Sequence, residues 1–197
     1  MKKSTAALIA LGLGASAAQA DTGVLALVET RSDAAFAGKL AELSTAAATA
    51  GCALIRDGRI MGADGDIDID RPDRFVYLRC NAPVIATKGG MLDRLTGLGD
   101  KVALAEGPII ASGGDGERAS GVGRAYILKL STYNNTDPAR RDRDLAAIDK
   151  QVSPLKARYH NEAFIRVHDA YGMKRPDEAV VIYYDSPEVG QRFRDTQ

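Results

Sequence analysis

The sequence predicts an α+β protein built from two tandem halves, each with the element order βαββαβ. Three observations predict this organisation. The order strand, helix, strand, strand occurs on both sides of a segment rich in glycine and serine. Short matching motifs fall in corresponding strands of the two halves. The only two cysteines, Cys52 and Cys80, lie at the two ends of one predicted hairpin.

Residues 1–20 have the features of a cleavable secretory signal peptide. Lys2 and Lys3 supply its positive end, an apolar stretch follows at Ala6–Ala15, and Ala18–Ala20 matches a signal peptidase site. The apolar stretch is shorter than the roughly 20 residues that span a bilayer. We expect cleavage after Ala20 and export to the periplasm, with secretion as the alternative. In such an oxidising compartment the two cysteines predict a structural disulfide.

The first half is expected at residues 21–111. A strand at Gly23–Glu29 precedes a helix that Ser32-Asp33 would cap and that carries Phe36, Leu40 and Leu43 at helical spacing. Two further strands, a short helix and a last strand are predicted at Cys52–Arg56, Arg74–Cys80, Met91–Leu98 and Val102–Ile110. Residues 112–123 form the predicted linker.

The second half is expected at residues 124–197 and repeats the order. Its strands are predicted at Arg124–Leu130, Glu162–Asp169 and Glu178–Asp185. Asp137-Pro138 would begin a long helix with apolar residues three and four positions apart, from Leu145 to Tyr159, and Ser186-Pro187-Glu188 a final one. No fourth strand is predicted before Gln197, so either the first half or another molecule, as in a homodimer, would cover the free edge.

Two motif matches indicate an internal repeat. Arg71–Val76 aligns with Arg175–Val180, and Ala53–Arg56 aligns with Ala163–Arg166. A βαββαβ unit folds as a ferredoxin-like sheet whose second and third strands form a hairpin. That hairpin would bring Cys52 beside Cys80, and by loop-closure entropy their disulfide contributes about 3 to 4 kcal/mol.

The second half resembles the small dimeric α/β-barrel domains that include antibiotic-biosynthesis-type monooxygenases. The resemblance rests on its element order and on Asp185-Ser186-Pro187-Glu188 before the terminal helix. It implies two sheets packed face to face, here within one chain, around a pocket for an apolar or aromatic ligand. Haem-degrading members use Asn, Trp and His, and this chain has no tryptophan.

The candidate ligand-binding residues are Arg166, His168, Tyr183 and Tyr133, which together would suit an anionic or aromatic ligand. A histidine at a strand end that faces water is the simpler interpretation of His168. His160 is expected to cap the C-terminus of the long helix.

The carboxylates of Asp64, Asp66, Asp68 and Asp70 alternate in a way that suits calcium, but they lack an EF-hand pattern, so a solvated hairpin tip is the simpler interpretation. No metal site, cofactor or catalytic residue is predicted. The 26 basic and 26 acidic residues balance, which argues against nucleic-acid binding, and no later apolar run is long enough to span a membrane.

The leading functional prediction is therefore a periplasmic protein that binds a small molecule or a protein partner without catalysis. The alternatives are a cofactor-free monooxygenase or isomerase in the pocket of the second half, and an interaction protein that adds a strand at the open edge.

Overall fold

The structure is a computed structural model that describes residues 21–62, 68–87, 89–112, 125–133, 137, 139–140, 143, 147, 160–184 and 186–188. Its helices and strands, in chain order, are β1 (Thr22–Glu29), α1 (Asp33–Thr49), β2 (Cys52–Arg59), β3 (Arg74–Cys80), α2 (Gly90–Thr96), β4 (Lys101–Ala111), β5 (Ala125–Ser131), β6 (His160–Arg166), β7 (Asp169–Tyr171) and β8 (Glu178–Tyr184).

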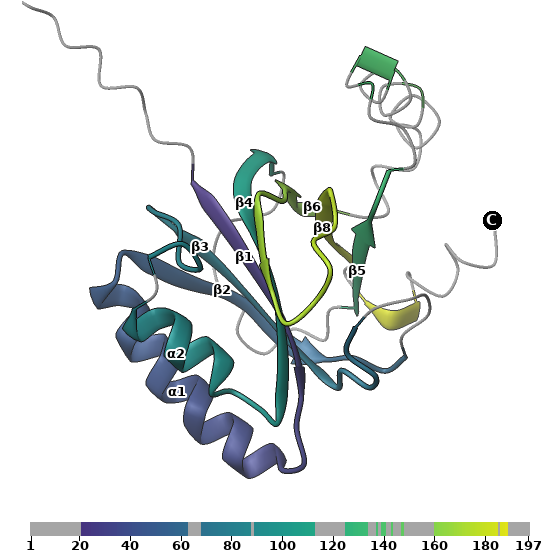
Figure 1. Cartoon of the computed structure of the whole chain (residues 1–197). Coiled ribbons are helices and arrows are strands. Elements are labelled where there is room, and N and C mark those ends of the chain that lie inside the picture. The colour runs from purple at the N-terminus through teal and green to yellow at the C-terminus, as the bar shows by residue number, and fades with distance from the viewer. Residues whose placement is uncertain are drawn as a thin grey trace, which may run out of the picture.

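The strands form one eight-stranded antiparallel sheet in the order β2-β3-β1-β4-β6-β8-β5, with β7 paired to β4 beside this path. The order β2-β3-β1-β4 and the two helices on one face are those of a ferredoxin-like unit (Figure 1). The sheet curves so that β5, β6 and β8 lie across the other face of the first unit (Figure 1). Among the described strands β2 and β5 remain the two ends, so the barrel is open between them.

The first helix forms because its capping residue and its apolar spacing agree. The Ser32 side chain accepts a hydrogen bond of 3.3 Å from the backbone N–H of Ala35, which satisfies one of the free donors of the first turn. Phe36, Leu40, Leu43 and Ala47 are buried at intervals of three and four residues. Gly51 follows the helix with a φ of 70°, a backbone conformation that glycine adopts without steric cost.

Two apolar clusters lie on opposite faces of the β1–β4 sheet. The first packs α1 and α2 against one face, and includes Val24, Leu78 and Leu104. The second fills the space between the two parts of the curved sheet; we call it the barrel interior, and its buried members are Leu25, Leu27, Ile55, Ile69, Phe75, Tyr77, Ala103, Ala105, Ala163, Ile165, Val167, Ala179 and Val181. The barrel interior therefore takes side chains from both halves of the chain.

Strand β4 joins the two parts of the sheet, because it pairs with β1 along most of its length and with β6 near its end. Ile109 of β4 lies opposite Ile165 of β6. The backbones cross closely at Gly107, where an added Cβ would lie 1.9 Å from the carbonyl oxygen of Arg166. Glycine is needed here because any side chain would push the two segments apart.

The two hairpins, β2–β3 and β6–β8, have the same register. In each, a bulge follows the fourth residue pair from the loop, at Ile55 in β2 and at Glu162 in β6. Asp73 and Asp177 also make equivalent contacts before β3 and β8. The Asp73 side chain accepts from the backbone N–H of Thr30, and the Asp177 side chain accepts from that of Tyr133.

These contacts explain why Arg-Pro-Asp precedes both β3 and β8: in each half the aspartate holds the backbone N–H of a neighbouring segment. They correct the other motif match, because Arg59, and not Arg56, occupies the hairpin position of Arg166. Whether the halves arose by duplication stays a prediction.

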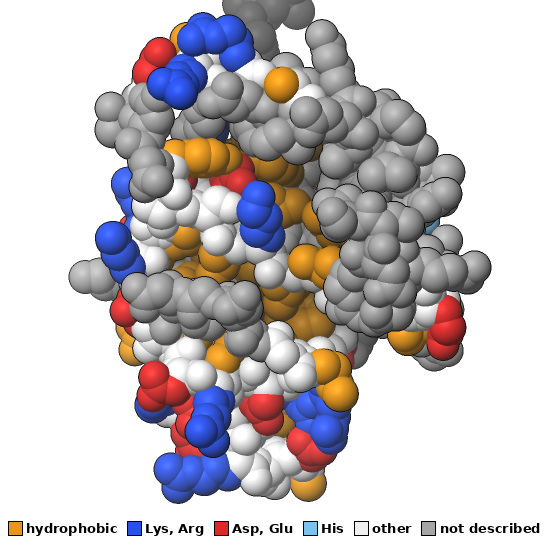
Figure 2. Space-filling model, turned by 90° about the vertical axis from the view of Figure 1, so that its right-hand side faces the viewer, with side chains coloured by type: hydrophobic (Ala, Val, Ile, Leu, Met, Phe, Trp, Pro, Cys, Tyr) orange, Lys and Arg blue, Asp and Glu red, His pale blue; other side chains and the backbone are white. Residues whose placement is uncertain are grey.

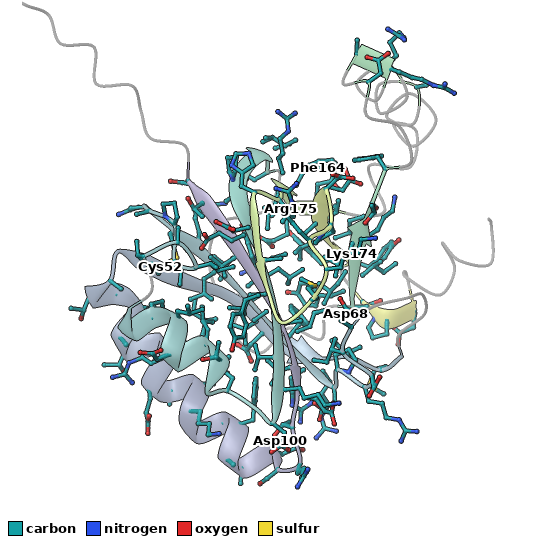
Figure 3. The ribbon with its side chains drawn as sticks, in the orientation of Figure 1. Cys52, Asp68, Asp100, Phe164, Lys174 and Arg175 are labelled. Carbon is teal, nitrogen blue, oxygen red and sulfur yellow. A yellow bond between two sulfur atoms is a disulfide. The ribbon has the colours of Figure 1, made fainter. Side chains whose placement is uncertain are left out.

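The disulfide and the first-half strands agree with expectation. Cys52 and Cys80 lie opposite each other in β2 and β3 and are bonded (Figure 3 labels Cys52 at the start of β2). The predicted strand at Glu162–Asp169 is wrong in its bounds, since β6 begins at His160 and the separate β7 follows it. Most of the predicted long helix, the signal peptide and most of the linker lie outside the described residues. Of the described helices, none is long and apolar enough to cross a membrane.

Candidate functional site

A cluster of polar and aromatic side chains lies in the barrel interior where β2, β3, β6 and β8 face one another. Its centre is an ion pair between Arg56 and Glu162. The Arg56 Nε lies 2.9 Å and its second terminal nitrogen 2.8 Å from the Glu162 Oε2. The two side chains are 2% and 0% exposed. The pair therefore links the two halves across the interior and away from water.

The two bulges explain why these charged residues point inward. In a regular strand, successive side chains point to opposite faces. A bulge adds one residue to one strand and re-aims the side chains beside it. In β2 the bulge lies between Leu54 and Arg56, and Arg56 then pairs opposite Tyr77 on the interior face. In β6 the bulge is at Glu162, next to the interior residue Ala163.

The phenol ring of Tyr183 connects the ion pair to a row of aromatic side chains. The Arg56 guanidinium carbon lies 6.0 Å from the centre of this ring. The His160 imidazole is stacked on the same ring, with centroids 4.6 Å apart and planes inclined by 16°. Tyr126 follows at 6.0 Å and Phe75 lies 5.2 Å beyond it. We call Phe75, Tyr126, Tyr183 and His160 the aromatic row.

Tyr77 brings a hydroxyl group into the same cluster from β3. Its side chain is fully buried, and no described residue meets its hydroxyl oxygen with full hydrogen-bond geometry, although the Arg79 side chain lies near it. Burial raises the pKa of Tyr77 to about 12, an effect that the nearby positive charge of Arg79 partly opposes and the negative charge of Glu162 reinforces. The Tyr77 hydroxyl therefore stays protonated and can act only as a neutral donor or acceptor at ordinary pH.

A second buried carboxylate, Glu106, lies on the helix-covered face of the sheet and has a structural role. Its Oε2 accepts hydrogen bonds from the backbone N–H groups of Val84 and Ile85. Burial raises the pKa of Glu106, against the lowering effect of these two bonds. Glu106 thus holds the loop after β3 and does not reach the barrel interior.

The structure separates the four residues that the sequence singled out. Tyr183 is buried in the barrel interior. Arg166 and His168 are exposed and alternate with Ile165 and Val167, which are interior residues, so they lie on the opposite face. The Tyr133 hydroxyl donates to the carboxylate of Glu178. The structure thus places Arg166 and His168 on the face opposite Tyr183, and a ligand site at the four residues stays a prediction.

Two other expectations concern His160 and the acidic segment. His160 begins strand β6 and stacks on Tyr183. The end of the helix that it was expected to cap lies outside the described residues, so that role stays a prediction. In the acidic segment, Asp68 accepts a hydrogen bond from the backbone N–H of Lys174 (Figure 3), and Asp70 pairs with Lys101 at 3.2 Å. Asp64 and Asp66 lie outside the described residues, and no group of three potential metal ligands occurs in the described part of the chain.

Sequence reasoning missed Arg56, Glu162 and Tyr77, although all three lie in predicted strands or at their ends. Their only signal was a charge or a phenol beside apolar residues, which is equally typical of a strand whose other face meets water. The bulges that turn Arg56 and Glu162 inward leave no mark in the alternation of residue types.

Comparisons with known proteins agree on the fold. No family model and no curated protein matches the chain. An anthrone oxidase-like protein matches in structure with a TM-score of 0.54 and 11% identity, over 90% of this chain and 78% of the other. Two mutant chlorite dismutases from Candidatus Nitrospira defluvii match with TM-scores of 0.55 and identities of 10% and 11%, over 87% of this chain and 79% of theirs.

These neighbours carry the names of enzymes, and this finding overturns the expectation of a protein without catalysis. The narrower resemblance to antibiotic-biosynthesis-type monooxygenases is not among them. At such low identity the match concerns architecture alone. The comparisons thus show a shared ferredoxin-like α+β architecture, with TM-scores of 0.54 to 0.55.

Proposed function

We propose that this protein is an enzyme that oxidises a small aromatic molecule with molecular oxygen inside the barrel. The observation that carries the proposal is the buried Arg56–Glu162 pair beside the aromatic row. A buried ion pair is generally no more stable than apolar side chains of the same size. Charged groups in a buried setting are typical of functional sites. The aromatic row offers flat surfaces against which an aromatic ring can pack.

His160 is the proposed catalytic base. An imidazole can take up and return a proton near neutral pH. His160 is half-buried and stacked on Tyr183, which fixes the plane of its ring. Arg56 and Glu162 act as positioning residues, because Arg56 contacts the Tyr183 ring and Glu162 holds Arg56. The positive charge of Arg56 also favours negative charge that develops on a substrate near this ring.

For a substrate with an acidic methylene group between aromatic rings, as in anthrone, the proposed reaction consumes one O₂ and releases one water. His160 accepts a proton from the methylene carbon, and the C–H electron pair remains on the substrate as a delocalised anion. This anion forms a C–O bond with O₂, and the proton returns to give a hydroperoxide. Loss of water from the hydroperoxide then leaves a carbonyl group.

The choice of this substrate type is supported by the anthrone oxidase-like neighbour together with the aromatic row. Export to the periplasm, which the first 20 residues predict, is part of the proposal. O₂ is a co-substrate that diffuses into that compartment.

The test is oxygen uptake by the purified protein with anthrone as the probe. We expect uptake above the enzyme-free rate in the wild type and a loss of about 100-fold or more in His160→Ala, which is typical when a general base is removed. His168→Ala is the matched control, because His168 is exposed on the opposite face. Equal rates for His160→Ala and the wild type would refute the role of His160, and no uptake above the enzyme-free rate would refute the reaction.

A further inference from the structure

We propose that Tyr77 and Arg79 form a subsite for an anionic oxygen on the substrate, a carboxylate or phenolate attached to an aromatic ring. This inference rests on the proposed function in one respect, that the barrel interior takes up an aromatic molecule. It goes beyond that function by specifying the chemical group that the molecule carries and the residues that bind this group.

The first observation is the unpartnered Tyr77 hydroxyl. The Tyr77 side chain is 0% exposed, and no described residue accepts a hydrogen bond from its hydroxyl group; the nearby Arg79 side chain can only donate. A buried hydroxyl without a partner costs about 1 to 3 kcal/mol. Buried polar groups are otherwise almost always hydrogen-bonded. A ligand atom that accepts from this hydroxyl would remove that cost.

The second observation is the guanidinium of Arg79 near the same hydroxyl. Arg79 follows Tyr77 by two positions in β3, so both side chains leave the strand on the interior face. The Arg79 Nε is buried and also makes no hydrogen bond. It lies 3.8 Å from the Oδ2 of Asp21, which is beyond hydrogen-bond distance, and the Asp21 side chain is half exposed.

The balance of charged side chains around Tyr77 favours one negatively charged group on a ligand. Arg56 is already matched by Glu162 through two hydrogen-bond contacts. Among the described residues, Arg79 is paired with the carboxylate of Asp21 at 3.8 Å, an exposed partner that water screens. Tyr77 keeps its proton, since burial raises its pKa to about 12, so its hydroxyl can donate. Two donors, with a positive charge that is matched only by this exposed carboxylate, suit an anionic acceptor oxygen.

An aromatic ring attached to that oxygen would lie over the apolar part of the interior. Phe75, two positions before Tyr77 on the same face of β3, begins the aromatic row. In the space-filling view, hydrophobic side chains gather in a recess at the centre of the face (Figure 2). An aromatic acid would thus place its charge at Tyr77 and Arg79 and its ring beside the row.

The experiment measures binding with no need for turnover. The probes are 1-naphthoate and its neutral analogue 1-naphthamide, titrated into the full-length protein and followed by NMR. We expect the wild type to bind naphthoate at least 10-fold more tightly than naphthamide. Tyr77→Phe and Arg79→Gln should each remove most of this preference, and Arg79→Lys should restore part of it. Arg71→Gln, a change at an exposed arginine, should leave it intact.

Equal affinity of the wild type for the two probes would overturn the subsite, whether or not the variants fold. A preference for naphthoate that survives both Tyr77→Phe and Arg79→Gln would overturn it as well. The subsite and the proposed function can fail separately. Naphthoate binding that needs Tyr77 and Arg79, without oxygen uptake, would refute only the reaction. Oxygen uptake with equal binding of the two probes would refute only the subsite.

Discussion

Replacing Glu162 with leucine leaves the Arg56 guanidinium buried without its carboxylate. The Arg56 side chain is 2% exposed, and its nitrogens lie 2.8 and 2.9 Å from the Glu162 oxygen that is lost. Breaking a buried pair on one side costs about 3 to 5 kcal/mol. With a urea dependence of about 2 kcal/mol per molar, this loss lowers the urea midpoint by about 2 M. Arg56→Met should cost a similar amount, because it leaves the Glu162 carboxylate buried.

The double variant Arg56→Met/Glu162→Leu should recover most of the stability. It replaces both charges with apolar groups, a change that is neutral or stabilising by about 1 to 4 kcal/mol in other buried pairs. The four proteins form a double-mutant cycle, measured by urea unfolding. Arg31→Met is the control, since Arg31 and Asp100 form an exposed pair whose loss costs about 1 kcal/mol or less.

Two stability results would contradict a buried, closed Arg56–Glu162 pair. Single variants that cost no more than Arg31→Met would show that the Arg56–Glu162 pair is not buried and closed. A double variant that loses the sum of the two single losses would show that the two side chains act independently. A double variant that is stable and also fully active would remove the pair from the proposed site.

Three further predictions concern stability and are measured by urea unfolding. Replacing Cys52 and Cys80 together with alanine should lower the free energy of unfolding by about 3.5 kcal/mol, the loop-closure value for a sequence separation of 28; an unchanged midpoint would contradict this. Burial raises the pKa of Tyr77 to about 12 from 10.0, so its neutral phenol favours the folded state. That contribution to the free energy of unfolding is complete below about pH 10 and is lost as the pH rises to 12, by up to about 3 kcal/mol. Tyr77→Phe should not show this loss of unfolding free energy between pH 10 and 12. The same pH dependence of unfolding free energy in both proteins would contradict the prediction. Gly107→Ala should lower the free energy of unfolding by at least about 1 to 3 kcal/mol, because the new methyl group would lie 1.9 Å from a backbone oxygen. Gly38→Ala, which meets nothing within 4 Å on an exposed helix face, should stabilise by up to about 1 kcal/mol; similar effects of the two changes would contradict the crossing of β4 and β6.

The sequence predicted most of the first unit, because its local signals agree with its tertiary contacts. Strand β3 runs from Arg74 to Cys80 as expected, since five of its seven residues are apolar and buried. Strand β2 continues past the expected end at Arg56, because Asp57 and Gly58 pair with β3 in spite of their low strand propensity. There, pairing with a neighbouring strand outweighs the preference of the residues themselves.

The candidate site could not be predicted in the same way, because it depends on contacts across the barrel. Arg56 and Glu162 meet only when β4 carries the chain from one part of the sheet to the other. Their inward direction depends on two bulges, which alternation of residue types does not reveal. Tyr183 was singled out from the sequence and lies in the cluster, but with His160 as its neighbour and not His168.

The most direct test of the central claim is the fate of labelled oxygen during oxidation of anthrone. The wild-type protein is incubated with anthrone under ¹⁸O₂, and the product is analysed by mass spectrometry beside His160→Ala and the matched control His168→Ala. We expect accelerated formation of anthraquinone with one ¹⁸O atom in the new carbonyl, one O₂ consumed per product, and loss of the acceleration only in His160→Ala. Product that forms no faster than without protein, or that carries oxygen from water, would contradict it.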